Sequence, residues 1–427
     1  MAYIPVIIAF GMMVLAIPVP VCLLAGTFVY FGFINPTMPL TGVIQNLITQ
    51  SMSTSMLAPP FYIAAACVMT YSGITERLLD MCDCLLGHKK GGLAYVNVLL
   101  STLNGGMSGS ANADAAMQCK MLVPEMEKKG YPRPFCTVVT AASSLITPII
   151  PPGVPLILYA LMSGVSVGRM WVSGYIPGFL LCIAMMIVCF FFARKNNWSS
   201  GRTERASGRE IARSIWRSSL AMIIPLFMIF GLRTGAFTAT EGGTVLLMLA
   251  IAIGICYRKL KISHVVPVIK EAFTTTANVM LIVVSACGFS MYLSWERIPQ
   301  KLAEVMMGFS SSPAVFLILV VVLVFILGMF LDGTAILMIL TPLLCPVAQS
   351  YGIDLIVFGL IVLVVMYIGC LTPPFGTLMY MTCKLTDVSI PQFCRYSWAF
   401  ILAMLAVCLV MGLFPSVVTF MPNLIYG

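Results

Sequence analysis

Long apolar stretches alternate with short polar ones along almost the whole chain. A membrane-spanning helix needs about 20 predominantly apolar residues to cross the hydrocarbon layer of a bilayer. The pattern therefore predicts an all-α protein that crosses a membrane many times, with spans at 6–34, 56–73, 134–162, 174–193, 218–235, 242–257, 272–294, 355–382 and 396–421.

Two further apolar stretches, 91–126 and 313–348, are too long for one crossing and are interrupted in the middle. The interruptions are the small and polar runs NGGMSGSANADAAM at 104–117 and GMFLDGTA at 328–335. Irregular backbone at membrane depth is tolerated only beside protein or a water-filled cavity. Both stretches are therefore predicted to be re-entrant helical hairpins, which enter the membrane, turn and return on the same side.

Two of the predicted spans contain a pair of consecutive prolines. The span 134–162 includes TPIIPPGVP at 147–155, and the span 355–382 includes CLTPPFG at 370–376. Proline lacks the amide proton of the helical ladder and collides with the preceding turn, so two in succession favour an unwound segment over a simple kink. Both spans are predicted to be broken helices.

These features recur at one fixed separation, which predicts an internal repeat. Pairs of prolines, glycines and hairpin-tip residues lie 222 positions apart: Pro124 and Pro346, Gly130 and Gly352, Pro151 and Pro373, Gly106 and Gly328, Ser110 and Asp332. We divide the chain accordingly into an N-terminal scaffold span at 1–50, a first repeat at 51–180, scaffold spans at 181–265, a second repeat at 266–400 and the rest of the last span at 401–427.

The number of spans and the charge distribution predict that the two repeats are inverted. Five predicted spans separate the hairpins, and an odd number reverses the direction of the second. Basic residues cluster in the loop 194–217 and at both ends of the first hairpin, whereas the ends of the second carry no Lys or Arg. Because cytoplasmic loops are enriched in Lys and Arg, the first hairpin should open to the cytoplasm and the second to the periplasm. Inverted repeats with broken helices are a transporter plan, with the binding site where the repeats meet.

Composition supports the membrane assignment and excludes several other classes. Charged residues make up 9% of the chain and hydrophobic residues 60%, against about 25% charged in soluble domains. The net charge of +9 arises from the loop clusters, so it indicates topology and not a nucleic-acid partner. The 15 cysteines show no zinc-site spacing, and the chain has no HExxH, GxSxG or P-loop motif and only two histidines, so we expect no enzyme.

The broken helices and hairpin tips supply the chemistry for cations and an anion. An interrupted helix exposes amides at one new end, which suit a carboxylate, and carbonyls at the other, which suit a hard cation such as sodium. We predict two related cation sites, the first formed by Ser108, Ser110, Thr147, Ile150 and Pro152, and the second by Gly328, Asp332, Gly369, Thr372 and Pro373. The tip residues Ser110 and Asp332 should border one central cavity between these sites.

Asp114 and Asp332 are the acids within the hairpin interruptions. An ionisable group at membrane depth is costly and marks a functional site by default, which is our interpretation of Asp332. Asp114 lies one helical turn beyond the first tip, where a functional role and a structural hydrogen bond between helices are both open.

Five stretches together resemble the large membrane subunit of TRAP (tripartite ATP-independent periplasmic) transporters: GGMSGSANADAAM at 105–117, SSLITPIIPPGVPLILYA at 143–160, GLRTGAFTATEGG at 231–243, LDGTAILMILTPLLCPVAQSYGID at 331–354 and IGCLTPPFGTLMY at 368–380. The resemblance covers nearly the whole chain. It implies an elevator-type transporter of the bacterial inner membrane that takes up a small organic acid with sodium ions, two or more per cycle. It also implies two partners, a separate small four-helix membrane subunit and a periplasmic substrate-binding protein.

The resemblance completes the predicted substrate site as Ser110, Asn112, Gly153, Asp332 and Thr334. Three residues depart from the family pattern: Thr147 stands where a glycine is expected, Gly153 where a serine is expected, and Asn112 is more polar than usual. Other readings of the function remain open: a proton-coupled carrier that uses Asp332, a stand-alone ion or organic-anion transporter, and a channel subunit.

Overall fold

The computed structural model describes residues 3–15, 17–107, 109–198, 200–202 and 204–426. Its regular elements in these residues are helices, and the one β-type contact is an isolated bridge between Lys90 and Ser200, which confirms the all-α prediction. Six of the described helices are long and apolar enough to cross a membrane, and several shorter ones are equally apolar.

The N-terminal region differs from the prediction of one long span. Residues 6–34 form two helices, α1 (Ile4–Val14) and α2 (Val19–Val29), which pack against each other, and α2 continues into a π-helical turn at Tyr30–Ile34. The single span was wrong because Pro18 and Pro20 lie between its halves, and proline starts a helix far more readily than it continues one. An amphipathic helix that was not predicted, α3 (Leu40–Ser51), follows.

Both predicted hairpin stretches consist of two helices joined by a short non-helical tip. The first contains α6 (Gly92–Gly105) and α7 (Ala111–Lys128), and the second contains α15 (Pro313–Phe330) and α16 (Gly333–Ser350). The bounds of α7 and α16 differ by 222 residues at both ends, which is the separation found in the sequence.

Both proline-containing spans are interrupted as predicted. The first consists of α8 (Arg133–Ser144) and α9 (Val154–Ser163), and the second of α17 (Leu355–Cys370) and α18 (Thr377–Thr386). The Pro151–Pro152 and Pro373–Pro374 peptide bonds are cis.

Two short amphipathic helices, α5 (Ile74–Leu86) and α14 (Ile298–Phe309), precede the hairpins and were missed, since each is too short and too polar to resemble a span. The predicted basic loop 194–217 is also shorter than expected. The helix α10 (Val167–Asn196) extends into it, and α11 (Gly208–Thr234) begins early because Ser207 and Glu210 form a capping box.

The remaining helices match the predicted spans except at the C-terminus. Three of them are α4 (Ala58–Tyr71), α12 (Ala239–Cys256) and the long α13 (Val265–Trp295). The last predicted span, 396–421, is divided at Pro415 into α19 (Ile390–Leu413) and α20 (Pro415–Tyr426).

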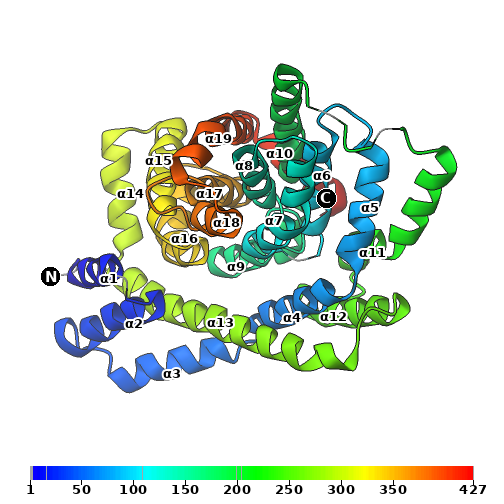
Figure 1. Ribbon diagram of the computed structural model, residues 1–427. Coiled ribbons are helices and arrows are strands. Elements are labelled where there is room, and N and C mark those ends of the chain that lie inside the picture. The colour runs from blue at the N-terminus through cyan, green and yellow to red at the C-terminus, as the bar shows by residue number, and fades with distance from the viewer. Residues whose placement is uncertain (1–2, 16, 108, 199, 203, 427) are drawn as a thin grey trace.

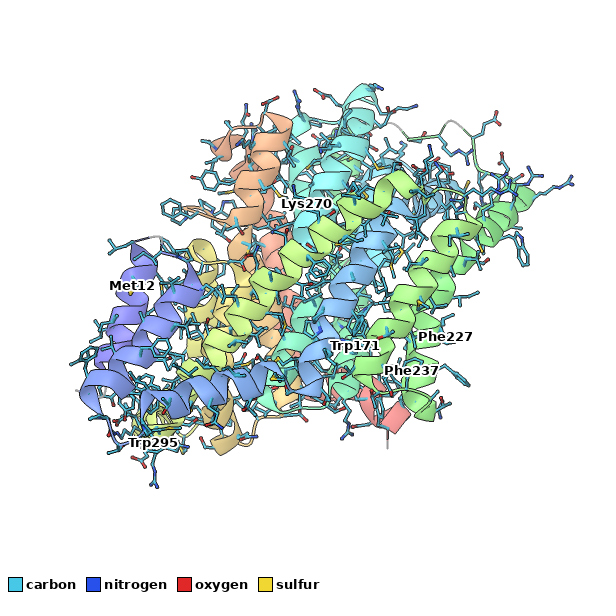
Figure 2. All side chains as sticks on the ribbon, turned by 90° about the horizontal axis from the view of Figure 1, so that it is seen from below. Met12, Trp171, Phe227, Phe237, Lys270 and Trp295 are labelled. Carbon is cyan, nitrogen blue, oxygen red and sulfur yellow. The ribbon has the colours of Figure 1, made fainter. Side chains whose placement is uncertain are left out.

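The helices form two groups in space. In Figure 1, the hairpins and broken helices gather into one compact group, and α3, α13, α4 and α12 form a row along its lower side. Figure 2, seen from below, shows α13 crossing this face from Lys270 near one end to Trp295 at the other, with α4 alongside part of it. Nearly all residues of α8 and α17 are buried, so these two helices form the centre of the compact group.

Candidate functional site

The tips of the two hairpins are built in the same way. Ser110 caps α7 by accepting a hydrogen bond at Oγ from the Ala113 amide, 3.3 Å away, and Asp332 caps α16 by accepting one at Oδ1 from the Thr334 amide, 2.9 Å away. Both side chains are exposed at the helix starts. Ser108, which we assigned to the first cation site, lies outside the described residues.

The packing of the broken helices brings these two tips to one place. The second piece of each broken helix packs on the hairpin of the other half: α9 on α16, and α18 on α7. A cavity of about 240 Å³ lies between the tips. Five pairs of its lining residues are 222 positions apart in the sequence: Ser110 and Asp332, Ala111 and Gly333, Asn112 and Thr334, Leu145 and Tyr367, Pro155 and Thr377.

Four of the five residues predicted to bind substrate line this cavity: Ser110, Asn112, Asp332 and Thr334. The fifth, Gly153, is buried directly beside it, because its neighbour Val154 lines the cavity and a Cβ built on Gly109 would lie 3.2 Å from the Gly153 Cα. A Cβ on Gly153 itself would collide with the Pro148 carbonyl, which explains why this position accepts glycine in place of the expected serine.

The third wall of the cavity was not predicted. It comes from one face of α4, which contributes Cys67 and Thr70, and from one face of α13, which contributes Glu271, Thr275 and Val279. Glu271 introduces a second carboxylate into the lining. An acid in the first turns of a long apolar helix was the available signal for it, by the argument that identified Asp332.

Three residues predicted for the first cation site, Thr147, Ile150 and Pro152, lie where the first hairpin contacts the unwound proline segment. A Cβ built on Gly105 would lie 3.1 Å from the Thr147 carbonyl oxygen and 2.7 Å from the Ile150 Cβ, and one on Gly109 would lie 3.4 Å from the Pro152 carbonyl oxygen. The glycines thus allow the hairpin backbone to approach the segment closely.

The second hairpin meets its proline segment through two glycines. A Cβ built on Gly328 would lie 3.0 Å from the Gly369 Cα, so these two predicted residues are in backbone contact. Thr372 is buried, and its hydroxyl donates to the Ile368 carbonyl at 2.7 Å, while its own carbonyl accepts from the Gly376 amide. Pro373 is half-buried beside it.

Four helices begin at the cavity: α7, α9, α16 and α18 all contribute residues of their first turn to its wall. Free amides and the helix dipole make such ends favourable for negative charge. Side chains cap α7 and α16, whereas Gly153 and Gly376 at the starts of α9 and α18 provide none. The lining contains no lysine or arginine but two carboxylates, so the helix starts are the groups in its wall that favour negative charge.

Asp114 does not line the central cavity. It is 2% exposed and is enclosed between α6, α7 and the first proline segment, where four side chains donate hydrogen bonds to it. The structure thus contains the hydrogen bonds between helices that were one of the two interpretations of Asp114.

Comparison with known proteins identifies relatives along nearly the whole chain. The model of a family described as "Tripartite ATP-independent periplasmic transporter, DctM component" matches residues 6–417. The sialic acid TRAP transporter large permease protein SiaM of Vibrio cholerae is 34% identical over 87% of both chains. The C4-dicarboxylate TRAP transporter large permease protein DctM of Pseudomonas aeruginosa is 30% identical over 86% of both, and the 2,3-diketo-L-gulonate large permease YiaN of Escherichia coli is 31% identical over 88% of both.

A solved structure shares the fold. The YdaH transporter of Alcanivorax borkumensis superposes with a TM-score of 0.61 over 90% of each chain at 13% sequence identity. At that identity the likeness concerns the arrangement of the helices alone.

Proposed function

Since the chain belongs to the large permease subunits of the TRAP transporters, and is therefore a multi-pass inner-membrane transport protein and not an enzyme, we propose that it takes up a small organic acid together with sodium ions. The relatives named above are permeases for sialic acid, C4-dicarboxylates and 2,3-diketo-L-gulonate, all of which are carboxylates. A carboxylate is accordingly the substrate class that we assign to this chain.

The observation that carries the proposal is the convergence of helix starts on a cavity without basic side chains. The uncapped starts of α9 and α18 offer backbone amides to a carboxylate, and the helix dipoles add a favourable potential. The hydroxyl and amide side chains of Ser110, Asn112 and Thr334 are placed to orient the rest of the substrate.

Sodium coupling follows from the charge of the same cavity. Asp332 and Glu271 already place two carboxylates in its wall, so an entering anion meets like charge. At 4 Å such repulsion is about 4 kcal/mol at an effective dielectric constant near 20. Cations bound at the two hairpin–proline contacts would offset it, so that sodium and the substrate enter together. The carbonyl and hydroxyl oxygens predicted for the first site, and the carbonyl and carboxylate oxygens predicted for the second, suit a hard monovalent cation.

An elevator movement fits the two groups of helices. The compact group holds both hairpins and most of the cavity wall, whereas α4 and α13 of the other group supply the remaining wall (Figure 1). We propose that the compact group carries substrate and sodium past α4 and α13, and that the equivalent lining residues of the two halves belong to an inverted repeat.

Two partners complete the proposed system: a small four-helix membrane subunit and a periplasmic binding protein that delivers the substrate. The permease protein SiaT of Haemophilus influenzae is 31% identical over 99% of this chain but longer, since the match covers 68% of it. Specificity would then be shared between the binding protein and the central cavity.

The test is uptake by proteoliposomes that contain this chain and the small subunit, with the binding protein added outside. Radiolabelled sialic acid, a C4-dicarboxylate and a sugar acid are compared under an inward sodium gradient, an inward potassium gradient and an inward proton gradient. We expect concentrative uptake of a carboxylate with the sodium gradient alone.

Two results would replace the proposal with its alternatives. Uptake that follows the proton gradient in the absence of sodium would establish a proton-coupled carrier. Concentrative uptake without the binding protein and the small subunit would establish a stand-alone transporter.

A further inference from the structure

The first hairpin encloses a polar cluster that the central cavity does not use. Its centre is the carboxylate of Asp114, which accepts hydrogen bonds from the Ser101 hydroxyl (2.7 Å), the Asn104 amide (2.8 Å), the Gln118 amide (2.8 Å) and the Thr147 hydroxyl (3.2 Å). Among the described residues no cationic side chain pairs with it. Burying a carboxylate is costly, and this cluster offsets the cost with neutral donors.

The cluster joins three elements that meet at the first predicted cation site. Ser101 and Asn104 belong to α6, Asp114 and Gln118 to α7, and Thr147 to the unwound segment after α8. The Thr147 hydroxyl lies 3.2 Å from Asp114 Oδ2 and 3.1 Å from the Ser101 carbonyl, so its one proton is shared between acceptors on the two arms of the hairpin.

The cluster also continues into α8. Ser143 on that helix lies 2.9 Å from the Ser101 hydroxyl and donates to Asn97 at 2.7 Å, and Asn97 donates to Thr140 at 2.7 Å. The last turns of α8, from which the unwound segment emerges, are therefore attached to the hairpin on the same side as Thr147.

The second half of the chain lacks the cluster and acts as an internal control. The positions 222 residues after Ser101, Asn104, Asp114, Gln118, Ser143 and Thr147 are Leu323, Ile326, Ile336, Leu340, Val365 and Gly369. The helices at these positions nevertheless correspond: α7 and α16 have bounds 222 residues apart at both ends, and α15 and α17 end three and four residues later than the equivalents of α6 and α8. Apolar packing therefore suffices to build such a hairpin, and a buried polar cluster is often no more stable than the apolar packing that replaces it. This argues that the cluster is retained for a purpose beyond folding.

We propose that Asp114 is a positioning residue for the first cation site: through Thr147 it fixes the carbonyl groups of the Thr147–Pro152 segment in the orientation that a sodium ion requires. The inference rests on the sodium coupling proposed above. In this chain the Thr147 hydroxyl links Asp114 to the segment. The second cation site has no such link and depends on the contact between Gly328 and Gly369.

The test is sodium binding by the full chain, which requires no knowledge of the substrate. The five tryptophans report thermal unfolding by fluorescence. Sodium that binds the folded state raises the melting temperature as its concentration exceeds the dissociation constant. Sodium chloride is titrated against choline chloride at constant ionic strength, and the readout is the sodium concentration that gives half of the total rise.

The informative variants are Thr147→Val and Thr147→Ser. Valine keeps the shape of threonine and removes the hydroxyl, so the half-maximal sodium concentration should increase about tenfold, the effect of losing one hydrogen bond in such a site. Serine keeps the hydroxyl and should retain the wild-type concentration. Asp114→Asn, which keeps the side-chain shape but loses the charge, should resemble Thr147→Val.

The matched control is Thr102→Val. Thr102 is equally buried on α6 beside Ser101, but its hydroxyl donates to the Val98 carbonyl of its own helix at 2.8 Å and takes no part in the cluster. This variant should keep the wild-type sodium concentration even if its melting temperature falls.

The outcomes separate the two proposals. If the wild type responds to sodium and Thr147→Val responds at the same concentration, Asp114 does not position the site and this inference is wrong. If the wild type shows no response to sodium beyond that to choline, the sodium coupling in the proposed function fails and this inference fails with it.

Discussion

The second arm of each hairpin carries one carboxylate near its start, but at different places. In the second hairpin it is Asp332, which caps α16 at the tip and faces the central cavity. In the first hairpin the tip position is Ser110, and the carboxylate is Asp114, one turn further along and buried. The position equivalent to Asp114 in the second hairpin is Ile336.

The difference shows how one backbone arrangement supports two roles for the same chemical group. Asp114 receives four side-chain hydrogen bonds, so its oxygens are already satisfied. Among the described residues Asp332 accepts one hydrogen bond, from the Thr334 amide, and keeps oxygen lone pairs that face the cavity. The interior carboxylate is therefore suited to holding protein groups in place, and the carboxylate at the tip to contacting an ion or substrate.

The largest effect that this comparison predicts concerns Asp332. Asp332→Ala should reduce sodium-driven uptake by the complete system about a hundredfold, because a lost charged contact in such a site costs on the order of 2–3 kcal/mol. The measurement is initial uptake in proteoliposomes at matched protein levels.

The control for this variant is Asp354→Ala. Asp354 also caps a helix, accepting from the Ile356 amide at 2.7 Å, but it caps α17 and lies outside the cavity lining. Its loss should cost about 1 kcal/mol of stability and leave uptake nearly unchanged. Equal uptake by both variants would mean that Asp332 is only a helix cap.

Substitutions at the equivalent buried positions Asp114 and Ile336 test whether the interior carboxylate holds protein groups in place. Asp114→Leu leaves the donors of Ser101, Asn104 and Gln118 without their acceptor, and we expect a loss of about 3–5 kcal/mol in the free energy of unfolding. Ile336→Leu conserves volume in an apolar environment and should cost less than about 1.5 kcal/mol. Unfolding in mixed detergent, followed by tryptophan fluorescence, measures both. A difference below about 1 kcal/mol would contradict the assignment of the cluster as a satisfied polar core.

The neutral tip residue should give a smaller effect than Asp332. Ser110→Ala removes one hydroxyl that caps α7 and lines the cavity, so uptake should fall about tenfold. Ser110→Thr retains the hydroxyl and serves as the matched variant, with uptake expected to remain near the wild-type rate. If Ser110→Ala transports at the wild-type rate with unchanged sodium dependence, the first tip does not contribute to the site.

The last test concerns the inverted orientation of the two halves in the membrane, and its variants should have the smallest effect on transport. The exposed Cys256 is replaced by serine, and one cysteine is then introduced at a time, at Ser200 or at Ser350. Uptake should remain unchanged in both variants. A membrane-impermeant maleimide should label Ser200→Cys from the cytoplasmic side and Ser350→Cys from the periplasmic side. Labelling of both from one side would contradict the inverted relation of the two halves.

The positions of the hairpins and of the broken helices could be predicted from the sequence because they depend on local chemistry. Runs of apolar residues, prolines and small polar residues decide where a helix in a membrane forms and where it stops. Ser110 and Asp332 were found as equivalent residues of the two interruptions, 222 positions apart, and Asp332 also as an acid at membrane depth. The local rules failed at residues 6–34, where Pro18 and Pro20 divide one apolar run into two helices.

The cavity itself was decided by tertiary structure. The sequence does not indicate that α9 packs on the hairpin of the opposite half, nor that α18 does the same, yet this exchange brings the two tips together. Glu271 and Thr70 join the site through helices far away in the sequence, and Asp114 found its donors on three different elements. The sequence by itself determined where the two hairpins and the two proline-broken helices lie, because those depend on neighbours along the chain. The packing of the helices decided which side chains meet, because burial and hydrogen bonding depend on neighbours in space.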